Sequence, residues 1–403
     1  MHIVPIDGGV CASLGFESSA VSAGIKNQET SRLDCALVVS REKAVVGGVF
    51  TTNMVKAAPV IWCKKVCERG IAQAVFINSG NANACTGEKG LIDVESTAKE
   101  VARLLKISEE EVLVLSTGVI GVPLPMERIL KGVNECVKWL SPEHHLNCAR
   151  AIMTTDTVPK EYAVAMQTNK GVVRIGGMAK GAGMICPNMA TMLSVITTDA
   201  KISKSFLQSA LSSVVSNTFN CIAVDNDMST NDSVVVLANG MSGIDIELNE
   251  EDKEVFLHAL YLVCERLAKS IVRDGEGATK FVEIEVVGAK SRDEAKRVAK
   301  SVAVSQLCKT AFFGGDPNWG RIVCAVGYSG VPVDPNKVSL WIADIKVFEK
   351  GVPTVYEEEL VANAMKNKEI RIKVDLGMGG EKVVFWTSDL SYDYVKINAN
   401  YRT

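Results

Sequence analysis

The chain has 403 residues, of which 47% are hydrophobic and 23% are charged, and its formal net charge is −3 at pH 7. This length suits one large domain or two moderate ones, and the composition is that of a globular protein. The charge gives no reason to expect nucleic acid or a membrane surface as a partner. No apolar run has the roughly 18 residues of a membrane span, and the first residues do not read as a signal peptide.

Cysteine and histidine usage argues against metal or disulfide chemistry. Most of the twelve cysteines lie among apolar residues, so we expect buried thiols in a cytoplasmic protein. Cys63 and Cys67 flank two lysines, but a zinc site would want further partners at suitable spacing. His144 and His145 follow a helix-start signal and are expected to face solvent. We therefore predict no metal site. With so few histidines in the chain, we also do not expect a Ser-His-Asp catalytic triad.

Apolar runs near the start of the chain indicate buried strands. Residues 35–40 and 44–51 are two such runs, separated by Arg41, Glu42 and Lys43, and this pattern predicts a hairpin. A further strand at 74–87 leads into a turn rich in Asn and Gly, where the asparagines either bind a ligand or form the turn. Residues 93–107 have helical spacing.

The next strand, 111–116, ends in Thr117 and Gly118. At such a strand end a hydroxyl and a backbone N–H can face developing negative charge, although the same residues also simply make turns. A helix is predicted at 126–139, and the hydroxyl-rich residues 153–157 then indicate a strand entry or a binding edge.

The central stretch, residues 174–200, reads RIGGMAKGAGMICPNMATMLSVITTDA. Four glycines surround Lys180 and suit tight turns or close approach to a ligand. Thr191 then begins a strand of branched residues. Its hydroxyl needs an adjacent base to act as a nucleophile. If the bond after Ala190 were cut, the new α-amine, with a reference pKa of about 7.7–8.0, would supply that base. Residue types alone favour the simpler interpretation, a Thr that opens a buried strand.

The second half of the chain mixes helices and strands. Asp225, Asp227 and Asp232 lack the glycine and glutamate of a calcium loop. Glu276 follows the end of a long helix, and the polar C-terminus would ordinarily be frayed. Helices are predicted at 203–217, 250–272, 292–310 and 356–366, and strands at 281–289, 338–346, 369–375 and 381–387, while residues 220–228 read as a strand running into an acidic turn.

This order of elements predicts an α+β fold of layered sheets and helices, because the strands and helices do not alternate as regular βα repeats. No phosphate-binding glycine loop is present, which disfavours nucleotide-dependent chemistry.

Residues 180–193, KGAGMICPNMATML, closely resemble the self-cleavage site of the ornithine acetyltransferase (glutamate N-acetyltransferase) family of arginine biosynthesis. Members of this family cut themselves immediately before the Thr of an Ala-Thr-Met-Leu sequence. The string Gly-Asp-Pro-Asn-Trp-Gly-Arg at 315–321 looks like a second hallmark, and its polar groups are expected to brace the site. The likeness runs from near Gly8 to Thr403.

The resemblance implies sheets sandwiched between helical layers, as in N-terminal-nucleophile enzymes. It also implies self-cleavage into an α chain, 1–190, and a β chain, 191–403, that share one intertwined fold. It makes Thr191 the nucleophile and gives the oxyanion hole to Thr117 and to the N–H of Gly118. The substrate contacts that it implies are Thr157, Lys180, Thr191, Glu276, Asn398 and Thr403.

The implied reaction moves the acetyl group of N2-acetylornithine to glutamate by a ping-pong mechanism through an acetyl-threonine, without a cofactor. It is expected to proceed in a heterotetramer of two α and two β chains, with no nucleic acid and no membrane involved. The sequence leaves open whether acetyl-CoA also serves as a donor. The alternatives are a self-processing aminopeptidase-like amidohydrolase, which would pass its acyl group to water, and an uncleaved amino-acid-binding protein.

Overall fold

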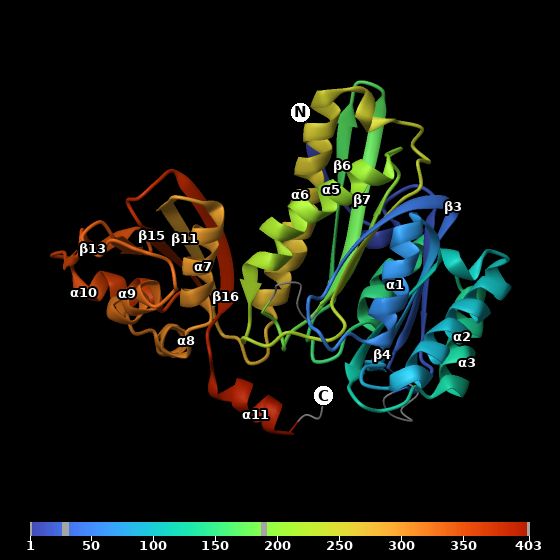
Figure 1. Ribbon diagram of the computed structural model, residues 1–403, viewed down its shortest axis with the longest axis horizontal. Coiled ribbons are helices and arrows are strands. Elements are labelled where there is room, and N and C mark those ends of the chain that lie inside the picture. Colours follow the sequence, from blue (N-terminus) through green and yellow to red (C-terminus); the bar gives the residue numbers. More distant parts are fainter. Residues whose placement is uncertain (1, 26–31, 187–191, 401–403) are drawn as a thin grey trace.

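The computed structural model describes residues 2–25, 32–186 and 192–400. Within these residues the chain forms two sheets, each with its own covering of helices (Figure 1). The larger sheet has the strand order β1-β6-β7-β8-β10-β3-β4-β5, and β2 pairs with β3. Its strands are β1 (Ile3–Ile6), β2 (Phe16–Val21), β3 (Cys35–Phe50), β4 (Ile71–Asn81), β5 (Val112–Val119), β6 (Lys160–Thr168), β7 (Gly171–Lys180), β8 (Leu193–Thr198) and β10 (Ser233–Ala238).

The smaller sheet has the order β14-β13-β12-β15-β11-β16-β9. Its strands are β9 (Ile222–Ala223), β11 (Phe281–Ala289), β12 (Ser339–Ile342), β13 (Ile345–Glu349), β14 (Val352–Pro353), β15 (Glu369–Asp375) and β16 (Glu381–Ser388). The α-helices are α1 (Ala58–Arg69), α2 (Gly87–Leu105), α3 (Met126–Lys138), α4 (His145–Ala151), α5 (Lys204–Asn217), α6 (Glu250–Arg273), α7 (Arg292–Ala303), α8 (Gln306–Gly314), α9 (Trp319–Gly327), α10 (Glu358–Met365) and α11 (Tyr392–Asn400).

Alternate side chains of the larger sheet enter different cores, as a strand buried on both faces requires. In β3, Ala36 and Val38 belong to a core that includes α1, whereas Cys35 and Leu37 belong to one that includes α2 and α3. A third apolar cluster runs from β6 and β7 through α5 and α6 into the smaller sheet. The α+β prediction of sheets between helical layers is therefore confirmed.

Strands from both sides of residue 190 share the larger sheet. β8, which follows residue 191, is antiparallel to β7, and Leu193 pairs with Lys180. On its other edge β8 is parallel to β10. The 1–190 and 191–403 portions thus contribute adjacent strands to the larger sheet.

Three predicted elements are wrong. The hairpin at 35–51 is one continuous strand, β3, because β4 pairs with it on either side of a register shift between Val39 and Ala44. The helix at 292–310 is two helices, since the side chain of Ser305 caps the start of α8. The strand at 338–346 is the β12–β13 hairpin, which turns at Ala343 and Asp344 with positive φ.

His145 does not face solvent as predicted, since its side chain is 17% exposed and its Nδ1 lies 2.9 Å from Glu161 Oε2. Its place at the first residue of α4 directs it toward β6. None of the described helices is both long enough and apolar enough to cross a membrane.

Candidate functional site

A polar pocket opens where β5 and β7 end, and both halves of the chain line it. Its empty volume is about 690 Å³, including the solvent at its mouth. That size is typical of pockets for small molecules. The lining residues are Ala82, Thr117, Gly118, Ile120, Thr154, Thr155, Lys180, Gly183, Met184, Asp225, Asp227, Ser229, Asn231, Glu276, Tyr394 and Asn398.

Thr117 and Gly118 lie at the end of β5, beside Gly80 of the parallel strand β4. Gly118 has φ +132°, and a Cβ built there would lie 2.3 Å from the carbonyl carbon of Gly80. No other residue type fits that position without moving a strand. Asn231 fixes the two strand ends, since its Nδ2 donates to the carbonyls of Ser116 (2.8 Å) and Ala82 (2.6 Å). The peptide that carries the Gly118 N–H is therefore held rigidly at the pocket wall.

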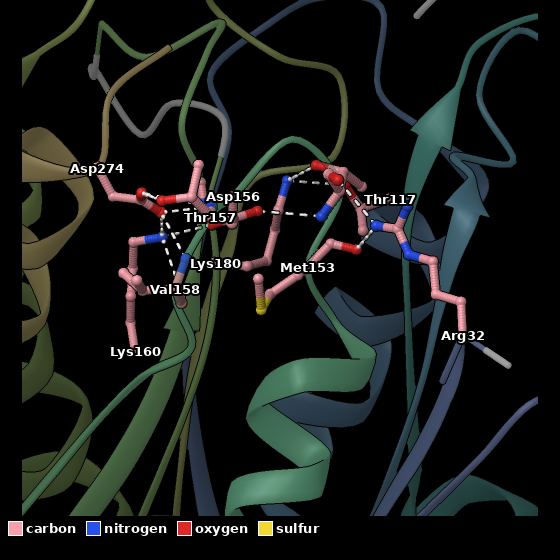
Figure 2. Close-up of polar contacts among 11 residues, drawn as sticks. Arg32, Thr117, Met153, Asp156, Thr157, Val158, Lys160, Lys180 and Asp274 are labelled. Carbon is pink, nitrogen blue, oxygen red and sulfur yellow. Dashed lines mark hydrogen bonds and ion pairs between the residues drawn. The ribbon is translucent and has the colours of Figure 1, made fainter. Parts of the chain in front are cut away.

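Lys180, the last residue of β7, reaches the same wall (Figure 2). It is 3% exposed, and its Nζ donates to Thr154 Oγ1 at 2.8 Å and to Thr117 Oγ1 at 3.3 Å. None of the acidic side chains in the described ranges forms an ion pair with it. Burial lowers the pKa of Lys180, and the nearby charge of Asp156 opposes that shift.

Asp156 organises the backbone on both sides of Lys180 (Figure 2). Its Oδ1 accepts the N–H of Gly181 at 2.7 Å, and its Oδ2 accepts the N–H of Thr154 at 3.0 Å. Burial alone would raise the pKa of Asp156, but the charges of Lys180 and Lys160 outweigh it and lower the pKa to about 2. This carboxylate stays ionised at neutral pH.

Lys160 links Asp156 to the second half of the chain. Its Nζ lies 2.7 Å from Asp156 Oδ1 and 2.5 Å from Asp274 Oδ2, and its side chain is 1% exposed. On the opposite side of the pocket wall, Arg32 donates to the carbonyls of Met153 and Thr154, both at 2.8 Å. Figure 2 shows the Lys160 contacts with Asp156 and Asp274 on the left and the Arg32 contact with Met153 on the right.

The mouth of the pocket is formed by the second half of the chain. Asn398 of α11 donates from Nδ2 to Glu276 Oε2 at 2.8 Å. Glu276 is 9% exposed, and Gly183 leaves room for it, because a Cβ there would lie 2.4 Å from Oε2. Asp225 accepts the N–H groups of Met184 (2.7 Å) and Ile185 (2.8 Å), and burial raises its pKa.

Five residues implied by the resemblance thus lie together, namely Thr117, Gly118, Lys180, Glu276 and Asn398. Thr157 does not join them. Its side chain is exposed and donates to Asp274, and its N–H donates to Asp274 Oδ2 at 3.0 Å. Ala190, Thr191 and Thr403 lie outside the described residues.

Sequence reasoning missed Thr154, Asp156 and Asn231 as individual residues. The hydroxyl run at 153–157 is the only signal for the first two, and it indicates a strand entry or a binding edge without naming either residue. Asn231 carried no signal, because its role is to hold backbone carbonyls of distant strands.

The Gly315–Arg321 string does not line this pocket. It turns between α8 and α9, where the Trp319 indole N–H donates to the Tyr356 hydroxyl at 3.1 Å and Arg321 donates to the Leu307 carbonyl at 2.8 Å. These contacts join residues beside the smaller sheet, and the expectation that this string braces the site stays a prediction.

One group of metal-type ligands occurs among the described residues, formed by Asp7, His145 and Glu161, whose ligand atoms lie within 4.8 Å of one another. None of the three lines the pocket.

Comparison with known proteins gives concordant results. The ArgJ family model matches residues 17–403. The arginine biosynthesis bifunctional protein ArgJ of Caldanaerobacter subterraneus subsp. tengcongensis is 49% identical over 403 residues, covering 99% of each chain. The glutamate N-acetyltransferase of Methanocaldococcus jannaschii is 47% identical over 410 residues, again covering 99% of each. A solved chain of the bifunctional protein ArgJ of Bacillus halodurans is 47% identical with a TM-score of 0.51, covering 52% of this chain and 100% of its own.

Proposed function

The chain belongs to the ArgJ family, and we propose that it is an acetyltransferase of arginine biosynthesis that moves the acetyl group of N2-acetylornithine to glutamate. The observation that carries this proposal is the pocket. It gathers an oxyanion-type pair, Thr117 and Gly118, a buried cation, Lys180, and a buried carboxylate, Glu276. A substrate amino acid carries a positive charge, for which the Glu276 carboxylate offers a partner in the pocket.

The first step is self-cleavage. The Thr191 hydroxyl attacks the Ala190 carbonyl, the chain shifts to an ester, and water hydrolyses that ester to free the α-amine. Two observations support this. Leu193, two residues after Thr191, pairs with Lys180 and therefore lies beside the pocket. The solved Bacillus halodurans chain is matched over its whole length by 52% of this chain. That share is about 210 of the 403 residues, close to the 213 residues that start at Thr191.

Acetyl transfer then runs in two halves. The Thr191 hydroxyl attacks the acetyl carbonyl while its own amine takes the proton and later returns it to the departing nitrogen of ornithine. The Thr117 hydroxyl and the Gly118 N–H donate to the oxyanion. The glutamate amine then attacks the acetyl-threonine carbonyl, the Thr191 oxygen leaves and regains a proton through the α-amine, and N-acetylglutamate is released. Glu276 and Asn398 hold the substrate at the mouth, where their mutual hydrogen bond fixes the carboxylate.

Several parts of the proposal rest on the family resemblance alone. These are the substrate contacts of Thr157 and Thr403, the α2β2 assembly, cytoplasmic location and the absence of a cofactor. Acetyl-CoA as a second donor is a further prediction of the same kind. The relative from Caldanaerobacter subterraneus, which is named as a bifunctional protein, supports the prediction of a second donor.

Intact mass under denaturing conditions tests the first step. Fragments of 190 and 213 residues are expected, and Thr191→Ala should stay at full length and transfer no acetyl group. A transfer assay then compares acetylornithine with and without glutamate. Release of free acetate at the same rate in both would favour the amidohydrolase. A full-length wild-type chain without turnover would favour the binding protein.

A further inference from the structure

Lys180 is bonded to the hydroxyls of the pocket wall rather than to an acid. A buried ammonium is costly unless it is hydrogen-bonded or paired. Lys180 Nζ has two hydroxyl acceptors, and the nearer one, Thr154 Oγ1, is held by the contacts of Arg32 and Asp156 to its backbone. The lysine is therefore fixed before any substrate enters.

The second acceptor is Thr117 Oγ1, at 3.3 Å. A threonine hydroxyl has one proton to donate and two lone pairs. In the described part of the chain, the Thr117 oxygen accepts from Lys180 while its own proton has no acceptor. Occupying a lone pair orients the hydroxyl and strengthens the bond that it donates in turn, because hydrogen bonds in a chain polarise one another. The Thr117 proton is thus left for the pocket.

Asp156 holds this arrangement. It binds the N–H of Gly181, which follows Lys180, and the N–H of Thr154, which supplies the other hydroxyl (Figure 2). It does not form an ion pair with Lys180, because its Oδ1 lies 2.7 Å from Lys160 Nζ. The Lys180 charge is therefore not neutralised by direct contact, which suits a group that acts on developing negative charge.

We propose that Lys180 is a positioning residue that acts through Thr117, aiming and polarising its hydroxyl toward the oxyanion, and that Asp156 sets Lys180 in that position. This inference rests on the proposed function. It differs from a substrate-carboxylate contact, in which Lys180 would act on binding and independently of Thr117.

A double-mutant cycle in kcat separates the two roles. Lys180→Met and Thr117→Val each remove the contact with little change of shape. Losing an oxyanion donor lowers the rate by about 10²–10³-fold. We expect each single variant to lose kcat on this scale and the double variant to be no slower than Thr117→Val, with an unchanged KM for acetylornithine. Losses that multiply, to about 10⁴-fold or more, would overturn the proposal. So would a Lys180→Met effect confined to KM.

Lys309 provides a matched control. It is also buried, and its Nζ donates to two hydroxyls, Thr387 Oγ1 at 3.1 Å and Ser388 Oγ at 3.3 Å, and to the Ser388 carbonyl. Burial lowers its pKa to about 8. Because it does not contact Thr117, any effect of Lys309→Met on kcat should multiply with that of Thr117→Val.

Lys180→Gln keeps the test decisive if the Lys180→Met variant fails to fold. Its amide still donates to Thr117 without a charge, so we expect a kcat between those of the wild type and Thr117→Val, and the same cycle applies to it. Asp156→Asn should lower kcat in the wild-type background but not in the Lys180→Gln background. A wild type that neither cleaves nor transfers acetyl would remove the proposed function itself, and this inference with it.

Discussion

Gly118→Ala is the sharpest test of the pocket wall. The Gly118 φ of +132° is one that residues with a Cβ rarely adopt. The added methyl carbon would also lie 2.3 Å from the Gly80 carbonyl carbon and 2.5 Å from the Asn81 nitrogen. Both contacts are with backbone, so a rotamer change cannot relieve them. The strand end must move, and the Gly118 N–H moves with it.

Two costs follow. A residue in a sparsely populated backbone region costs about 1–3 kcal/mol, and relieving the clash adds to this. A misdirected oxyanion donor costs about 10²–10³-fold in kcat, or 2.7–4 kcal/mol of transition-state stabilisation. We therefore expect a variant that folds with a lowered melting temperature and turns over at least about 10²-fold more slowly than the wild type.

Gly121→Ala separates these two costs. Gly121 lies three residues further along, has φ +79° and has no atom within 4 Å of an added Cβ. It does not line the pocket. Thermal unfolding followed by circular dichroism should show a loss for both variants, whereas acetyl transfer should fall only in Gly118→Ala. Equal kcat values for the two variants would refute the assignment of the Gly118 N–H to the oxyanion hole.

Two further predictions concern buried groups. Burial raises the pKa of Asp232 well above its unfolded value, so the folded chain retains a proton that the unfolded chain releases, and stability falls as pH rises from about 4 through the folded pKa. The test compares Thr191→Ala, which stays uncleaved, with the double variant Thr191→Ala/Asp232→Asn in urea unfolding. The free energy of unfolding of the double variant should rise relative to that of Thr191→Ala as pH increases. Parallel curves of unfolding free energy against pH would contradict this. Of the twelve cysteines only Cys85 and Cys324 are exposed, so a thiol reagent should modify two thiols rapidly in the native protein, and Cys85→Ser with Cys324→Ser should abolish the fast phase.

Elements with local signals at both ends could be predicted from the sequence. The strands β11 and β15 have the predicted bounds, and α5 begins one residue after the predicted start, because the hydroxyl of Ser203 caps it by accepting the Phe206 N–H at 3.3 Å. Caps and turn residues act over a few positions, so the chain itself carries the information.

Strand pairing could not be predicted in the same way, and β3 shows why. Arg41, Glu42 and Lys43 look like a turn because they are charged, yet they are exposed positions within one long strand. Arg41 forms an ion pair with Glu17 of β2, and Lys43 forms one with Glu111, which precedes β5. Neither partner is visible in the local pattern.

The residues of the site divide in the same way, into those that the sequence could identify and those that depend on contacts between distant segments. Thr117, Gly118, Lys180, Glu276 and Asn398 could be named because a family resemblance identifies them by position. Asp156 could not, because it holds backbone N–H groups at Thr154 and Gly181, which only the folded chain brings to one carboxylate. Residues that a family motif contains can be named from the sequence, whereas residues that position them depend on packing between distant segments.

The same distant contacts would keep the two fragments assembled after the proposed cut before Thr191. A cut before Thr191 falls between β7 and β8, and these strands pair from Ile175 with Thr198 to Lys180 with Leu193. Lys160 of the first fragment also forms a buried ion pair with Asp274 of the second, and breaking such a pair costs about 3–5 kcal/mol. Separating the fragments would expose both the sheet and this pair. The proposed cleavage would therefore release neither fragment, and a site lined by residues of both fragments needs that arrangement.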